Sequence, residues 1–177
     1  MPLVHAFKEL RDHRWVFVSI LGQVGGIVTR GDLQKAPVRM WLFGLVSLIE
    51  MQLLWCIRQS YPDGSWFEKL SKDRCKKAQG ILSNRRKKNI EIDLADCLEF
   101  ADKKTLLLKT RYLWKQMPFN SKEKAKHFFH QLEDLRNLLA HSQDIIGSNW
   151  PQNAEIALQA EDILEKLENI EIEPPNN

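Results

Sequence analysis

The side chains best suited to chemistry stand close together in the last third of the chain. Arg136 is followed by the polar Asn137, and His141 comes five positions after the arginine. A guanidinium keeps its positive charge and grips phosphate oxygens, whereas an imidazole gives or takes a proton near neutral pH. A fixed cation beside a proton donor or acceptor suits cleavage of a phosphodiester. We therefore predict Arg136, Asn137 and His141 as the catalytic residues.

A long amphipathic helix over residues 122–146 is predicted to carry these side chains. Its apolar stripe, which is typical of a helix packed on a core, consists of Leu132, Leu135, Leu138 and Leu139. At about 100° per residue, one narrow arc on the opposite side carries His127, His130, Asp134, Asn137 and His141. The first three of these are auxiliary candidates for the site. We expect the arc to be solvated or covered by another chain.

The spacing also imposes a geometric demand. Arg136 and His141 lie about 140° apart around an ideal helix, so one straight helix does not aim both at the same phosphate. Asn137 and His141 are four residues apart and share a face. A break in the helix near these residues, or a symmetric dimer that places two such segments side by side, would meet the demand.

The hexapeptide Arg136-Asn137-Leu138-Leu139-Ala140-His141 resembles the signature of the HEPN superfamily. These are all-helical domains that include many metal-independent endoribonucleases. The resemblance spans residues 38–170 and is specific only at the hexapeptide. It implies a homodimer with a cleft between two bundles, lined by both motifs.

The same resemblance implies a reaction. A substrate 2′-hydroxyl attacks the adjacent phosphorus, His141 acts as general base or acid, Arg136 holds the phosphoryl oxygens, and Asn137 orients substrate or histidine. RNA is the substrate, a 2′,3′-cyclic phosphate is the product, and no metal or other cofactor is needed. A further alternative is a toxin neutralised by a nucleotidyltransferase antitoxin. The version modified on tyrosine does not fit, because Gln143 stands two residues after His141.

The N-terminal segment differs from the rest of the chain. Its pattern predicts a helix over residues 3–11 and two strands, 15–20 and 24–29, around a turn at Gly22-Gln23. The run from Gly25 to Asp32 resembles the closing part of a CBS motif, in which the counterparts of Thr29 and Asp32 bind the phosphate and ribose of a nucleotide. About 35 residues match, and the partner repeat is absent. We favour a truncated remnant with Asp32 as a helix N-cap over an adenine-nucleotide sensor.

The remainder predicts helices separated by turns of Pro, Gly, Asn and Ser. The predicted helices cover residues 38–60, 66–88, 93–116, 122–146 and 153–170. Five helices with short connections favour an up-and-down bundle. The expected fold is therefore mainly α, a HEPN-like bundle over residues 37–170 with a small β/α appendage over 1–36 and a disordered tail over 171–177.

Positive charge is concentrated in the middle of the chain. Residues 72–126 hold 16 Lys and Arg against 7 Asp and Glu, although the net charge of the whole chain is only +3. The candidates for binding RNA phosphates are Arg74, Lys76, Lys77, Arg85, Arg86, Lys87 and Lys88. The alternative is a solvated helix end whose cations suit the helix dipole.

The apolar run over residues 40–57 is long enough to span a bilayer, but Glu50 stands in its middle. We therefore predict a buried helix and no membrane span. Glu50 either points to water or orients Arg136 or His141. Three widely spaced cysteines favour reduced thiols in a cytoplasmic protein.

Two classes of function remain open. The leading hypothesis is a homodimeric, metal-independent endoribonuclease with a composite Arg/His active site. The alternative is a non-catalytic regulatory or RNA-binding dimerisation module that senses an adenine nucleotide through the CBS-like segment, with an antitoxin or regulatory protein as a further partner. The sequence carries no phosphate-binding loop and no nucleophile elbow.

Overall fold

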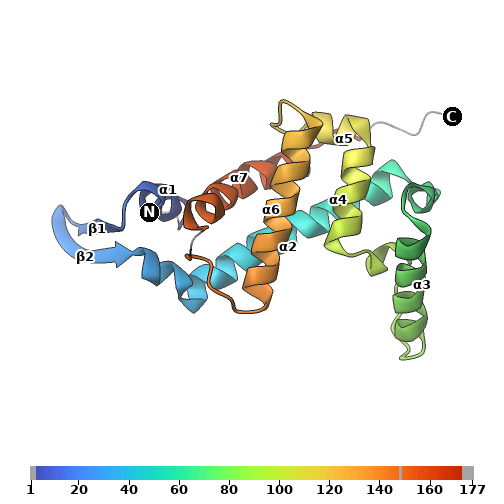
Figure 1. Cartoon of the computed structure of the whole chain (residues 1–177), viewed down its shortest axis with the longest axis horizontal. Coiled ribbons are helices and arrows are strands. Elements are labelled where there is room, and N and C mark those ends of the chain that lie inside the picture. The colour runs from blue at the N-terminus through green and yellow to red at the C-terminus, as the bar shows by residue number, and fades with distance from the viewer. Residues whose placement is uncertain (1–2, 148, 173–177) are drawn as a thin grey trace. The chain divides into compact units, whose positions relative to one another are not determined.

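The computed structural model describes residues 3–147 and 149–172 (Figure 1). Within these residues the protein is mainly helical, with 69% helix in seven α-helices and one small two-stranded antiparallel sheet. The elements in chain order are α1 (Leu3–Asp12), β1 (Trp15–Ile20), β2 (Gln23–Thr29), α2 (Ala36–Ser60), α3 (Lys72–Arg86), α4 (Phe100–Lys109), α5 (Arg111–Lys115), α6 (Lys122–Ala140) and α7 (Trp150–Glu168). The predicted fold class is confirmed at this level.

Contacts divide the chain into two compact units. Unit 1 holds the described residues up to Ser47 and those of His130–Ile163, and unit 2 holds Leu48–Phe129 and the described residues from Leu164 onward. The sequence predicts a boundary between residues 36 and 37. The contacts instead group the N-terminal segment with the start of α2 and with parts of α6 and α7 in one core. Residues 173–177 of the predicted tail lie outside the described residues.

Aromatic packing ties the N-terminal segment into unit 1. The ring of Phe7 on α1 is 1% exposed and lies 5.5 Å from the ring of Trp41 and 5.6 Å from that of Trp150, between ring centroids. The indole N–H of Trp150 donates to the carbonyl oxygen of Leu10 at 2.9 Å, so the one polar atom of this buried side chain is satisfied. The segment predicted as an appendage is therefore part of a helical core.

The two predicted strands form a hairpin with antiparallel register Trp15↔Thr29 to Ile20↔Gln23. The turn residues are Leu21 and Gly22, both with positive φ (51° and 79°), as a two-residue hairpin turn requires. The predicted turn at Gly22-Gln23 is one residue late. Glycine tolerates this backbone without strain, whereas Leu21 accepts it as a fully exposed tip.

Two of the predicted helices in unit 2 are interrupted. Residues 66–88 divide into a 3₁₀ turn (Ser65–Lys69) and α3, because Ser71 caps α3 and its hydroxyl accepts from the backbone N–H of Arg74. Residues 93–116 divide into a 3₁₀ turn (Ala95–Cys97), α4 and α5. The predictions of two continuous helices are therefore wrong, because Ser71 begins a new helix at α3 and the chain breaks again at Thr110, between α4 and α5.

Glu50 has a partner in unit 2. Its carboxylate lies 2.8 Å from the ammonium nitrogen of Lys103, whose side chain is only 9% exposed. A buried ammonium needs such a counter-charge, so the acid in this apolar helix serves the fold. Glu50 is therefore paired with Lys103. The sequence also offers Glu50 as a residue that orients Arg136 or His141, but these two residues belong to unit 1.

Among the described residues, α2 is the one helix whose length and composition would allow a membrane span, and 39% of its most apolar window is buried inside the protein. One such helix is weak evidence for a membrane span, because the core helix of a globular protein passes the same test. Cys56, Cys75 and Cys97 are free and buried. Burial raises the pKa of the Cys56 thiol to about 12, which makes it a poor nucleophile.

Candidate functional site

The helix that carries the Arg/His motif ends inside the motif. α6 stops at Ala140, so the predicted continuation to residue 146 is wrong. Ser142 has φ +53°, its backbone N–H donates to Leu139 O at 3.2 Å, and the N–H of Gln143 donates to Leu138 O at 2.8 Å. This pair of bonds is the Schellman arrangement that closes a helix, here with serine in the left-handed position. His141 is therefore the first residue after α6.

The end of α6 fixes how the three motif side chains lie. Asn137 and His141 are exposed and Arg136 is half-buried. The guanidinium of Arg136 donates to the side-chain oxygen of Asn137 at 3.3 Å, and the backbone N–H of His141 still donates to Asn137 O at 3.0 Å. The chain leaves the helix only after His141. The break therefore does not turn His141 toward Arg136, and within one chain the two residues keep different directions.

Arg39, near the start of α2, holds this helix end in place. Its guanidinium donates to three backbone oxygens, those of Leu138 at 3.2 Å, Leu139 at 3.3 Å and Gln143 at 2.8 Å. Carbonyls at the last turn of a helix have no partner within the helix and carry its negative dipole end. A planar cation with several donors suits them well. Arg39 is therefore a positioning residue for the segment that carries His141.

The chain after His141 is anchored by the same group of residues. Gln34 accepts from Arg39 at 3.0 Å and from the backbone N–H of Ile145 at 3.4 Å, and its amide donates to the Asp144 carboxylate. An open hollow of about 610 Å³ borders this network. It is lined by Gln34, Ala36, Arg39, Met40, Ser142, Gln143 and Asp144. A small polar ligand would meet both donors and acceptors there, one residue from His141.

Replacing Arg39 with alanine is expected to lower the free energy of unfolding by about 1–3 kcal/mol, because charged hydrogen bonds to helix-end carbonyls are lost. Chemical denaturation of the purified protein measures this change. Arg39→Lys, which keeps the charge but cannot reach three oxygens, should fall between parent and alanine variant. Arg14→Ala, at an exposed arginine in the same unit, is the matched control and should change stability by less than about 0.5 kcal/mol. Equal effects of the two alanine variants would contradict the role given to Arg39.

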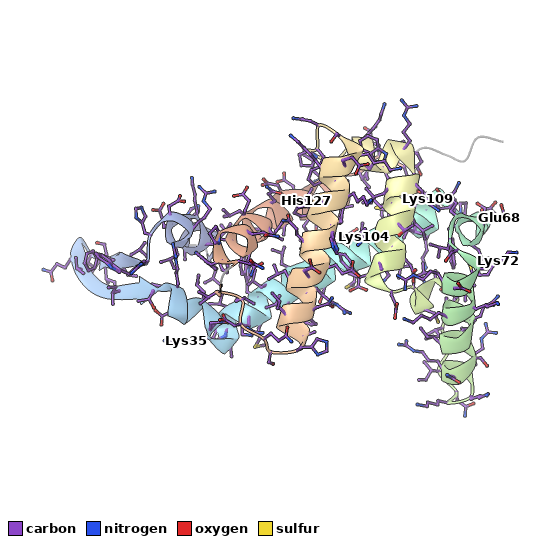
Figure 2. The ribbon with its side chains drawn as sticks, viewed as in Figure 1. Lys35, Glu68, Lys72, Lys104, Lys109 and His127 are labelled. Carbon is purple, nitrogen blue, oxygen red and sulfur yellow. The ribbon has the colours of Figure 1, made fainter. Side chains whose placement is uncertain are left out.

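The auxiliary candidates of the polar arc are open to solvent. His127 lies on α6 in unit 2 (Figure 2), and His130 and Asp134 lie on the same helix in unit 1; all three are exposed. His130 precedes His141 by eleven residues, which is about 16 Å of helix rise. The two histidines of one chain are therefore too far apart to act on one phosphate.

The basic cluster of unit 2 is partly neutralised. Arg74 pairs with Glu99 at 3.1 Å and with the buried Asp102 at 3.0 Å, and Lys77 lies 2.8 Å from Glu99. The hydrogen bond from Lys77 lowers the pKa of Glu99. The predicted RNA-binding residues that remain exposed and have no such ion pair in the described part of the chain are Lys76, Arg85, Arg86, Lys87 and Lys88. The cationic surface is thus centred on the end of α3.

The residues of the CBS-like segment bind each other. The backbone N–H and the hydroxyl of Thr29 both donate to one Asp32 oxygen, at 2.7 and 2.8 Å, and Lys35 lies 2.6 Å from the other. The bonds from Lys35 and Thr29 hold the pKa of Asp32 well below its usual range. Thr29, and not Asp32, is the N-cap of the 3₁₀ turn Arg30–Gln34, so the predicted capping role of Asp32 is corrected. Both side chains hold this turn together.

No model of a known protein family, no characterised protein and no solved structure matches the chain. The sequence predicts Arg136, Asn137 and His141 as site residues but does not identify the supporting roles of Arg39 and Gln34. One signal was present, because Arg39 is the only cation between Ala36 and Ile57 and stands at a helix start, where a cation is unfavourable without a specific partner.

Proposed function

We propose that this protein is a cytoplasmic, metal-independent endoribonuclease of the HEPN-like kind that acts as a homodimer. The observation that carries the proposal is the helix end at His141. There an exposed imidazole, an exposed amide and a half-buried guanidinium occupy two turns of α6. The turn after them is fixed by Arg39 and Gln34, which supports a preorganised site.

The reaction needs three actions that these side chains supply. A base removes the proton of the 2′-hydroxyl, whose oxygen bonds to phosphorus while the bond to the 5′-oxygen breaks. An acid then protonates that leaving oxygen, and a 2′,3′-cyclic phosphate remains. Arg136 holds the non-bridging oxygens as charge develops, and Asn137 orients Arg136 through the contact at 3.3 Å. In a dimer, Arg136 of one chain can face the partner's His141, so each site has one guanidinium and one imidazole, which takes the 2′-hydroxyl proton as base and then acts as the acid.

Exposed apolar residues on α2 favour one surface for this dimer. One side of the helix, within an arc of about 140°, carries Met40, Phe43, Leu48, Met51 and Trp55, which are between 42% and 73% exposed. Gly44 lies on the same side with open space above it, so a second helix could approach closely. Met40 also lines the hollow beside Ser142 and Asp144. The sequence predicts that the polar arc of α6 is solvated or covered by another chain, and its residues are exposed; the apolar residues favour α2 as the surface for the second subunit.

Cleavage of a labelled mixed RNA pool tests the proposal. The purified dimer is incubated with the pool in the presence and in the absence of a strong chelator. We expect cleavage at the same rate under both conditions. A protein that keeps its fold and its dimer but leaves the RNA intact would overturn the proposal.

A second candidate function is RNA binding without cleavage. The exposed cations Arg85, Arg86, Lys87 and Lys88 at the end of α3 favour it, because backbone phosphates need no further chemistry to be bound. Retention of intact RNA that weakens steeply with salt, together with no cleavage, would identify this function. Heat-stabilisation by adenine nucleotides that is lost in Thr29→Ala would add the regulatory role of the CBS-like segment.

A further inference from the structure

The hairpin of unit 1 exposes an unusual amount of apolar surface. The side chains of Trp15, Phe17, Ile20, Val24 and Ile27 are between 50% and 68% exposed. The rings of Trp15 and Phe17 contact each other edge to face, with centroids 4.9 Å apart. Among the described residues the sheet consists of these two strands alone, and a two-stranded sheet is marginally stable in water. The hairpin therefore exposes apolar side chains that a further strand or another chain would normally cover.

The backbone of β1 offers a free edge with a defined register. Just beyond the ladder, the N–H of Arg30 donates to Arg14 O at 3.3 Å. Hydrogen-bonded and non-hydrogen-bonded pairs alternate in an antiparallel ladder, so Val16 and Val18 exchange bonds with β2. Trp15, Phe17 and Ser19 consequently turn their N–H and C=O groups away from β2, toward the open edge.

The open edge of β2 is less suited to pairing. The register between the strands shifts at Val18/Ser19, which leaves Gly25 as a bulge. The N–H of Thr29 is already taken by the carboxylate of Asp32. By contrast, Trp15–Ile20 is a regular strand with no charge, glycine or proline, and no third strand pairs with it in the part of the chain that the structure describes.

We propose that β1 pairs antiparallel with β1 of a second copy of this chain, across a twofold axis through Phe17. In this register Phe17 lies opposite the partner's Phe17, Trp15 opposite the partner's Ser19, and Val16 opposite the partner's Val18. The outward N–H and C=O groups of Phe17 then bond to those of its counterpart. The result is a four-stranded sheet in the order β2, β1, β1, β2.

Two further features favour a second copy as the occupant. A twofold axis places identical residues close together, and like charges there would repel; β1 carries no charge. Trp15 and Phe17 lie on one face of β1, and in this register their counterparts from the second copy lie on the same face, which extends the aromatic contact of Trp15 with Phe17 across the axis. The contact uses unit 1 alone and does not depend on the ribonuclease proposal. Because it lies on a different element from the α2 surface, the two contacts together would join dimers into a larger assembly.

Disulfide trapping of the full-length protein tests the register. Phe17→Cys places two thiols opposite each other, at the Cα separation of about 5.5 Å that a disulfide needs. Ser19→Cys is the matched control on the same strand, because two residues at this position would stand about 13 Å apart. The native cysteines are buried and do not compete. Under mild oxidation we expect a covalent dimer from Phe17→Cys, at least tenfold faster than from Ser19→Cys. No dimer from Phe17→Cys, or equal rates from both, would overturn the proposal.

A charge test gives an independent readout. Phe17→Lys and Phe17→Glu each place two like charges at the axis, and each should at least halve the assembly mass measured by sedimentation. An equimolar mixture of the two variants should recover the parent mass, since opposite charges then face each other. Val24→Lys, at an exposed position on β2, should keep the parent mass. A Phe17→Lys variant with the parent mass would also overturn the proposal.

Discussion

Replacing His141 with alanine is expected to slow RNA cleavage by about 10²–10⁴-fold, the usual contribution of a positioned general acid or base. The fold should survive, because the imidazole is exposed and the bonds that end α6 are made by the backbone of Ser142 and Gln143. Initial rates on one labelled RNA, measured with parent and variant at equal dimer concentration, give the ratio.

His130→Ala is the matched control for this prediction. His130 is exposed on the same helix, about 16 Å before His141 along the helix axis. Its loss should change the rate by less than about threefold, because this imidazole is too remote to transfer the same proton. A His141→Ala variant that cleaves as fast as the parent would remove His141 from the reaction, and a large effect of His130→Ala alone would move the site up the helix.

Arg136→Ala should slow cleavage by about 10²–10³-fold, the typical loss when one donor to a developing oxyanion is removed. The change should be mainly in kcat, because the interaction strengthens as charge builds on the phosphoryl oxygens. Arg136→Lys should recover part of the rate, since it restores the charge without the two-pronged geometry of a guanidinium. An unchanged kcat with a raised KM would show that Arg136 only binds substrate.

Mixed dimers show whether one site takes its residues from two chains. A dimer of one Arg136→Ala chain and one His141→Ala chain can be isolated with two affinity tags. If the site is composite, one of its two sites has both residues intact, and we expect about half the parent rate. Each variant alone should be nearly inactive. A mixed dimer as slow as the single variants would place Arg136 and His141 of one chain in the same site.

Much of the fold could be predicted from the periodicity of the sequence. The strands at Trp15–Ile20 and Gln23–Thr29 and the helices α1, α2 and α7 lie within a few residues of the predicted ranges. Their signals are local, namely alternation, a 3.6-residue repeat and breakers at the ends. The helix breaks at Ser71 and Thr110 were not predicted. Serine and threonine are common inside helices. Only the bond that the Ser71 hydroxyl accepts from the backbone marks the start of α3, and only the bonds of Thr110 to the preceding turn mark the end of α4.

The residues proposed for the site come from the sequence, whereas the contacts that hold them come only from the structure. The residue types and spacing of Arg136, Asn137 and His141 indicated phosphate chemistry. The contact of Arg39 with the end of α6 joins residues about 100 positions apart, and no local pattern encodes such a distance. The end of α6 was missed for a related reason, because Ser142 takes the left-handed conformation that glycine usually signals.

The measurement that tests the central claim most directly is analysis of the RNA ends made by the parent protein. A labelled RNA is incubated with the dimer in excess chelator, alongside a matched strand whose 2′-hydroxyl is replaced by hydrogen at the cleaved nucleotide. If Arg136 and His141 promote attack by the 2′-hydroxyl, the RNA yields a 2′,3′-cyclic phosphate and the matched strand stays intact at that position. Cleavage of the 2′-deoxy strand at the same rate, or RNA left whole by a folded dimer, would contradict the account.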